Sequence, residues 1–162
     1  MHQATLQDER FIDRVLALAQ RSRDAGHHPF AALVVGADGS VIAEAMNASS
    51  SDRTAHAEMN ALRLASARYS PAELAGATLY ANAEPCAMCA GGTYWSGVGR
   101  VVYALSEASL LQLTGSDPEN PTLALPCREV FARGQRATEV IGPMREEEAR
   151  LAHAGFWKPH QI

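Results

Sequence analysis

Two short segments, about thirty residues apart, constrain this sequence most, because each offers metal-binding side chains at the predicted start of a helix. The first is HAE at residues 56–58, which opens a stretch with the apolar spacing of an amphipathic helix. The second is PCAMC at residues 85–89, also at a predicted helix start. Met59, Leu62 and Ala65 already supply a packing face. The polar side chains of HAE are therefore available for chemistry.

The two segments can share one metal ion. Cys86 and Cys89 are three residues apart, so their side chains lie on the same side of a first helical turn, where free amides favour the thiolate. His56 and Glu58 point about 200° apart on a regular helix, so they serve one site only at the helix end. One imidazole and two thiolates leave the fourth position of a tetrahedral Zn²⁺ open, as expected of a catalytic site.

Glu58 is the candidate base of this site. Two thiolates cancel the charge of Zn²⁺, so a water molecule bound there is less acidified than in a three-histidine site. A nearby base is then needed, and Glu58 is expected to take the proton from water and return it to the substrate.

Composition limits the class of protein. A chain of 162 residues with 47% hydrophobic and 20% charged residues is expected to form one domain, residues 1–162. No apolar run approaches a membrane span and no secretory signal is visible at the start, so we expect a cytoplasmic protein. Three cysteines make a poor disulfide framework. The net charge of −4 disfavours nucleic acid without excluding a local basic patch.

Hydrophobic periodicity predicts an α/β sandwich of five strands with one antiparallel edge hairpin. The first two strands are joined by a tight turn at Asp38 and Gly39, whereas the long gap before the last strand permits a parallel crossover. The predicted strands are 30–35, 40–47, 77–82, 100–104 and 138–142, and the predicted helices are 6–23, 56–65, 85–96, 128–133 and 145–157.

The pairing of HAE with PCAMC resembles the zinc-dependent cytidine deaminase superfamily. The resemblance implies a three-layer αβα sandwich with a five-stranded mixed sheet, zinc bound by His56, Cys86 and Cys89, and Glu58 as the proton shuttle. It also implies at least a homodimer, and the segment around Phe156 and Trp157 is a candidate for reaching a neighbour's pocket.

Within the superfamily the chain is similar to bacterial free-base guanine deaminases. Those enzymes typically have Pro-Phe-Gly before the first strand, an Asn ending the second, Tyr-Trp after the cysteine pair and an Asp beyond the fourth strand. The chain matches these positions except at Ala31, where Gly is expected. The residues that the resemblance marks as substrate contacts are Phe30, Asn47, Ala57, Trp95 and Asp117.

The substrate implied is a free nucleobase, guanine or a related aminopurine, whose hydrolysis releases ammonia. Asp117, as an acceptor-only carboxylate, would select a ring N–H, or it would only cap the turn before Pro118. The alternatives are another amino-heterocycle such as an aminotriazine or a cytosine-like base, tRNA wobble adenosine, and a non-catalytic zinc-stabilised domain. The tRNA enzymes usually end in a basic helix, whereas the last predicted helix here begins REEE.

Other polar residues are expected to be structural. Cys127 is expected to be a small buried residue rather than a ligand, because the open zinc position must admit water. Asn47 could simply end a strand in a turn. The remaining histidines show no ligand spacing to HAE and are expected to be solvated or packed; they are His27, His28, His153 and His160.

Overall fold

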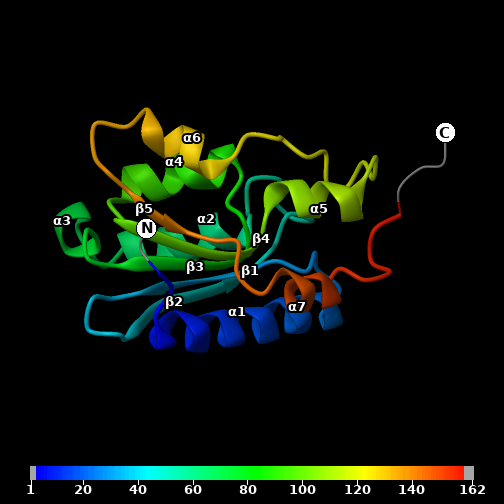
Figure 1. The fold of residues 1–162 in the computed structure, drawn as a ribbon, viewed down its shortest axis with the longest axis horizontal. Coiled ribbons are helices and arrows are strands. Elements are labelled where there is room, and N and C mark those ends of the chain that lie inside the picture. The colour runs from blue at the N-terminus through cyan, green and yellow to red at the C-terminus, as the bar shows by residue number, and fades with distance from the viewer. Residues whose placement is uncertain (1–2, 159–162) are drawn as a thin grey trace.

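The computed structural model describes residues 3–158 and contains a five-stranded mixed sheet of order β2-β1-β3-β4-β5 (Figure 1). β1 (Ala31–Val35) pairs antiparallel with β2 (Val41–Met46) and with β3 (Thr78–Ala83). β4 (Arg100–Leu105) and β5 (Glu139–Ile141) then continue parallel to β3. The predicted α/β fold with its antiparallel edge hairpin is confirmed.

Helices cover both faces of the sheet, which gives three layers. α1 (Leu6–Asp24) and α7 (Glu146–Leu151) lie on one face, and α2 (Ala57–Ser66), α4 (Ala87–Ser96) and α6 (Cys127–Ala132) on the other (Figure 1).

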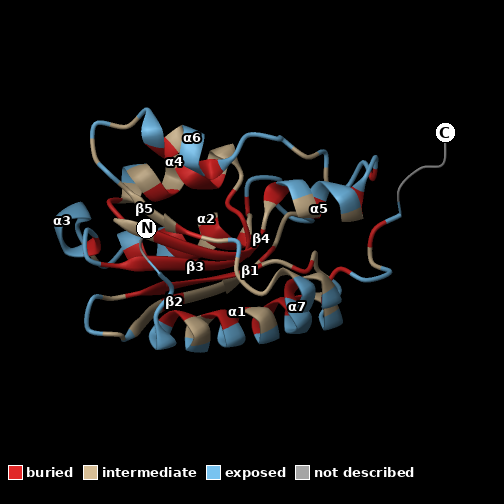
Figure 2. Ribbon diagram, viewed as in Figure 1, coloured by how far each residue is buried: buried red, intermediate tan, exposed pale blue. Residues whose placement is uncertain are grey.

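The strands alternate their side chains between two apolar cores. In β1, Leu33 packs on the α1 side and Val34 on the α2 side, so every residue of the strand is buried. Figure 2 shows the central strands as a buried layer between helices with exposed outer faces. This explains the unbroken apolar run at residues 30–35. Within residues 3–158, no helix is long and apolar enough to cross a bilayer.

Three helical features differ from the sequence prediction. α3 (Pro71–Leu74) and α5 (Glu107–Thr114) were not predicted, and α7 ends at Leu151 instead of continuing to residue 157. Gly155 has a positive φ of 68°, which a helix does not allow. The turns after α7 bring Trp157 back against Phe30, and this burial replaces the predicted last helical turns.

A buried ion pair fixes α1 to the sheet. Arg100, the first residue of β4, donates two hydrogen bonds to the Asp8 carboxylate, at 2.7 and 2.9 Å. The hydroxyl of Tyr80 donates to the same carboxylate at 2.7 Å, and Arg100 also pairs with Glu139 on β5. Asp8 is therefore a structural residue with several partners, and it lies toward the amino end of β4.

Candidate active site

Two helix starts bring the predicted metal-binding side chains together. His56 and Cys86 are the N-cap residues of α2 and α4, and neither side chain caps its own helix. The Nδ1 atom of His56 lies 3.6 Å from the Sγ atoms of both Cys86 and Cys89. All three ligand atoms lie within 4.8 Å of one another. His56 is the N-cap and lies outside the regular helix, so its side chain and the first turn of α2 can face the same point. Residues two apart within a regular helix could not do so.

The spacing of these atoms fits zinc. Zn–S bonds of about 2.3 Å and Zn–N bonds of about 2.05 Å at a tetrahedral angle would separate the nitrogen and sulfur ligands by about 3.6 Å. The two measured distances have this value. One imidazole and two cysteine sulfurs are also a donor set that zinc accepts, and they leave one position for water or substrate.

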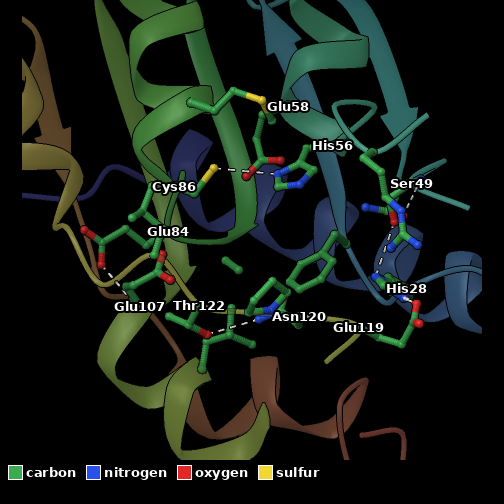
Figure 3. Close-up of a pocket in the computed structure, with 18 of the residues that line it drawn as sticks. His28, Ser49, His56, Glu58, Glu84, Cys86, Glu107, Glu119, Asn120 and Thr122 are labelled. Carbon is green, nitrogen blue, oxygen red and sulfur yellow. Dashed lines mark hydrogen bonds and ion pairs between the residues drawn. The ribbon is translucent and has the colours of Figure 1, made fainter. Parts of the chain in front are cut away.

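Glu58 lies beside this group on the first turn of α2. The residue is only 7% exposed, and its carboxylate faces His56 and Cys86 (Figure 3). Before any metal is considered, burial raises the pKa of Glu58 to about 7, and the charge on Cys86 adds to this effect. Glu58 can therefore both accept and release a proton near neutral pH.

A pocket of about 330 Å³ opens above His56, Glu58 and Cys86. Its volume is at the lower end of the range for small-molecule sites. The walls come from the start of β1, the end of β2, the residues that follow β3 and β4, and the loop after α5. The further lining residues are His28, Phe30, Asn47, Ser49, Arg53, Ala83, Glu84, Met88, Glu107, Leu110 and residues 118–123.

Asn47 reaches the pocket in a fixed orientation. Its Oδ1 atom accepts hydrogen bonds from the backbone N and the hydroxyl of Ser49, at 2.9 and 2.8 Å. The side-chain amide is buried, so its Nδ2 group is the part left to donate to a ligand.

Phe30 forms an apolar wall that the C-terminal segment supports. Trp157 and His153 pack against the Phe30 ring, with centroids 5.9 and 5.3 Å away. The indole of Trp157 donates to Nδ1 of His153 at 3.0 Å. Residues 153–157 therefore back the pocket of their own chain. His160 lies outside the described residues.

Three of the predicted substrate contacts do not line this pocket. Trp95 is 81% exposed on α4 and does not line the pocket of its own chain. Ala57 packs its side chain into the core on the α2 side of the sheet. Asp117 borders a neighbouring hollow, and its carboxylate accepts from the backbone amides of Glu119 and Lys158, at 2.9 and 2.6 Å. Capping the turn, the alternative weighed for Asp117, is therefore formed in the structure.

Glu84 and Glu107, which follow the carboxyl ends of β3 and β4, were not predicted from the sequence. Parallel strands bring these ends to the same edge of the sheet, where ligands commonly bind. Glu84 directly follows the wholly buried strand β3, and Glu107 comes two residues after the end of β4, so a charged residue just after an apolar strand was the signal that could have identified both. His28, expected to be solvated or packed, also lines the pocket. Cys127 and Ala31 are both buried among the hydrophobic core residues.

The chain is similar to a known protein family and to several known enzymes. Residues 5–105 match the family described as the cytidine and deoxycytidylate deaminase zinc-binding region. A probable cytosine deaminase of Schizosaccharomyces pombe is 36% identical over 151 residues, which cover 93% of this chain and 92% of the relative. The guanine deaminase of Bacillus subtilis is 41% identical over 99 residues, 59% of this chain and 63% of that enzyme.

Solved structures and tRNA-modifying enzymes also match. A guanine deaminase structure from Nitrosomonas europaea superimposes with a TM-score of 0.70 at 30% identity, covering 94% of this chain and 85% of the other. A tRNA-specific adenosine deaminase of Haemophilus influenzae is 37% identical over 102 residues, 62% of this chain and 59% of the relative. The relatives thus share one zinc-binding region while their names give different substrates.

Proposed function

This chain belongs to the cytidine and deoxycytidylate deaminase family of zinc-dependent hydrolases, and from that premise we propose that its substrate is a free nucleobase, guanine or a related aminopurine. The observation that carries the proposal is the buried Glu58 carboxylate beside the group of His56, Cys86 and Cys89 at the floor of a small pocket. A flat base can enter such a pocket with its amino-bearing ring carbon next to Glu58.

In the proposed mechanism, His56, Cys86 and Cys89 hold zinc, which when bound supplies a Lewis acid that makes water acidic. Glu58 takes a proton from that water and delivers it to the ring nitrogen next to the amino-bearing carbon. It then moves the remaining proton of that water, now on the hydroxyl added to the ring carbon, to the departing amino group. A C–O bond forms and the C–N bond breaks, so water and the aminated base give the oxo base and ammonia.

The walls of the pocket favour a neutral base over a nucleotide. Glu58 and Glu107 bring carboxylates to the pocket, and Glu119 adds one at the rim. Burial lowers the pKa of His28, so this histidine adds little positive charge at neutral pH. A phosphate group would be repelled by these carboxylates unless Arg53 offset them.

Phe30 and Asn47 are the proposed substrate contacts. Phe30 offers its ring to the flat face of a base, and the oriented amide of Asn47 can donate to a ring nitrogen or carbonyl. Such apolar contacts provide affinity, while the amide provides orientation.

Cytosine is the second candidate, because a relative that matches 93% of this chain is a probable cytosine deaminase. Deamination of tRNA adenosine has less support. Glu146, Glu147 and Glu148 make the first turn of α7 acidic, and the whole chain carries a net charge of −4. Binding to a polyanion depends on positive charge.

Ammonia release from a panel of compounds tests the proposal. The panel contains guanine, 2,6-diaminopurine, adenine, cytosine, an aminotriazine, the matching nucleosides and an anticodon stem-loop. We expect turnover of a free purine base and much slower turnover of nucleosides. The Glu58→Gln variant is the control for background release. Fastest turnover of cytosine would select the second candidate, and turnover of the stem-loop alone would contradict a free-base enzyme.

We also propose that the protein is at least a homodimer formed by one domain, residues 1–162. Exposed Trp95 and Leu64, on α4 and α2, provide apolar surface on the face of the molecule away from α1. Sedimentation equilibrium tests this, and a monomer at working concentrations would contradict it.

A further inference from the structure

Glu107 presents a buried carboxylate to the pocket. It is the first residue of α5 and follows the carboxyl end of β4, next to the end of β3 that leads to Cys86. The residue is 7% exposed and lines the pocket. In Figure 3 its carboxylate points toward the pocket interior below Cys86, whereas the Glu84 carboxylate turns away from it.

The backbone at Glu107 is held firmly. Oε2 of Glu84 accepts from the backbone N of Glu107 at 2.9 Å, and Oε1 of Glu84 accepts from the backbone N of Cys127 at 2.9 Å. The preceding residue, Ser106, caps α5 and donates to Glu146 on α7. These contacts fix the backbone at Glu107, so the position of its Cα atom relative to the pocket is defined.

The Glu107 carboxylate differs from its neighbours because its oxygens have no donor within the part of the chain that the structure describes. Among residues 3–158, no hydrogen bond or ion pair to this side chain is formed. By contrast, both oxygens of Glu84 and both oxygens of Asp117 accept from backbone amides. The Glu107 oxygens are not among the fully buried atoms without a partner in residues 3–158, so they stay open to the pocket, where a ligand that supplies N–H groups can reach them.

We propose that Glu107 is the specificity-determining acceptor of the pocket, which binds an N–H group of the base other than the amino group that is lost. This inference rests on the proposed free-base activity and assigns to Glu107 the selection of a ring N–H that the sequence suggested for Asp117. The substrates it favours are bases with a second N–H on their edge, such as oxo- and diamino-purines. A base that lacks this group leaves the carboxylate unpaired, which is a strong basis for rejection.

The charge of Glu107 is consistent with this role. Burial raises the pKa of Glu107 to about 7, and the charges on Cys86 and Glu84 contribute to the shift. The charge on Glu58 raises this pKa further, whereas the charge on His56 lowers it, and the ionised form of Glu107 accepts N–H groups best.

The test compares Glu107→Gln with Glu129→Gln, a matched change in the first turn of α6, outside the pocket. Kinetics are measured on guanine and on 2-aminopurine, which has no N–H at the ring position next to its amino-bearing carbon. Binding of xanthine, which has no amino group to lose, is measured by calorimetry. Zinc content and melting temperature are measured for each variant.

We expect Glu107→Gln to raise KM for guanine and Kd for xanthine at least about tenfold, since a hydrogen bond to a charged group is lost. The value of kcat is expected to change less than about threefold, and 2-aminopurine should be affected less than guanine. Glu129→Gln should match the parent. Glu107→Asp, which keeps the charge but shortens its reach, should give a smaller rise in KM and serves if the Gln variant does not fold.

Two failures are distinguishable. If the parent releases ammonia from none of the bases, the proposed function fails. If the parent deaminates guanine but the Gln variants at 107 and 129 bind xanthine and guanine equally well, only the inference about Glu107 is overturned. A loss in kcat with unchanged KM and unchanged xanthine binding would overturn it as well, because Glu107 would then act on the reaction and not on binding.

Discussion

Asp8 and Glu58 are both buried carboxylates, at 1% and 7% exposure, but their surroundings shift their pKa values in opposite directions. Burial alone would raise the pKa of Asp8, yet hydrogen bonds from Arg100, Thr5 and Tyr80 hold it well below its usual range. Burial raises the pKa of Glu58 to about 7, and within residues 3–158 no arginine or lysine forms an ion pair with it.

This difference in pKa distinguishes a carboxylate that stabilises the fold from one that can take part in acid-base catalysis. A buried carboxylate with a guanidinium partner is charged at every physiological pH and holds elements together. A buried carboxylate without such a partner can change its protonation state near pH 7, which acid-base catalysis requires. A buried carboxylate can therefore be structural or catalytic, and the presence or absence of a guanidinium partner determines which role it has.

Loss of a metal ligand should have the largest effect. We expect Cys86→Ala to lose both bound zinc and activity, because two remaining ligands hold the ion poorly. Zinc content by atomic absorption and ammonia release measure this, with about one zinc ion per chain expected in the parent. Cys127→Ala is the matched control, since Cys127 is buried but lies outside the metal group. Full zinc occupancy in Cys86→Ala would show that the ion is held elsewhere.

Glu58→Gln should lower kcat by at least about a hundredfold, which is the contribution of a positioned acid-base group. Zinc content and melting temperature should stay close to those of the parent, because the amide fills the same space. Turnover near the parental rate would remove Glu58 from the mechanism. Such a result would also weaken the distinction drawn between Glu58 and Asp8.

Asp8→Asn should lower the stability of the protein and leave its catalytic rate unchanged, which is the reverse of the effect expected for Glu58→Gln. We expect a loss of about 3 kcal/mol in the free energy of unfolding, because Arg100 loses its buried partner, while kcat stays unchanged at low temperature. Urea unfolding at several pH values gives the measurement. Since the folded-state pKa of Asp8 is lowered, its contribution is complete above pH about 4 and is lost as the pH falls. Equal acid sensitivity of the variant and the parent would contradict this role.

Trp95→Ala should have the smallest effect. Trp95 is mostly exposed and lies outside the pocket of its own chain, so we expect KM and kcat to change by less than about twofold. Activity and sedimentation are measured together. A large rise in KM without a change in assembly would restore Trp95 as a substrate contact.

Much of the metal group could be predicted because it depends on local geometry. A residue at a helix start has a fixed relation to the turn that follows, so the HAE and PCAMC segments could be interpreted without knowing the fold. The same helical geometry could have been used to check whether Trp95 faces the metal group. It comes six residues after Cys89, about 240° around the helix, so it faces away from the metal group.

The pocket wall could not be predicted in this way, because distant contacts build it. The hydrogen bond from the backbone N of Cys127 to Glu84 joins residues 43 apart in sequence. The ring of Trp157 packs against Phe30, which lies near the other end of the sequence. No periodic pattern encodes such pairings. The predicted substrate contact of Asp117 depended on a loop whose path the sequence leaves open, and the structure gives its carboxylate to backbone amides.

Glu84 accepts hydrogen bonds from the backbone amides of residues 107 and 127. Every amino acid except proline has such an amide, so the frame of the pocket is indifferent to the side chain that stands at position 107. A substitution there changes what the pocket recognises while the scaffold that delivers it stays intact. In evolutionary terms, new substrate preferences can arise at this position one mutation at a time, without first passing through an unstable protein.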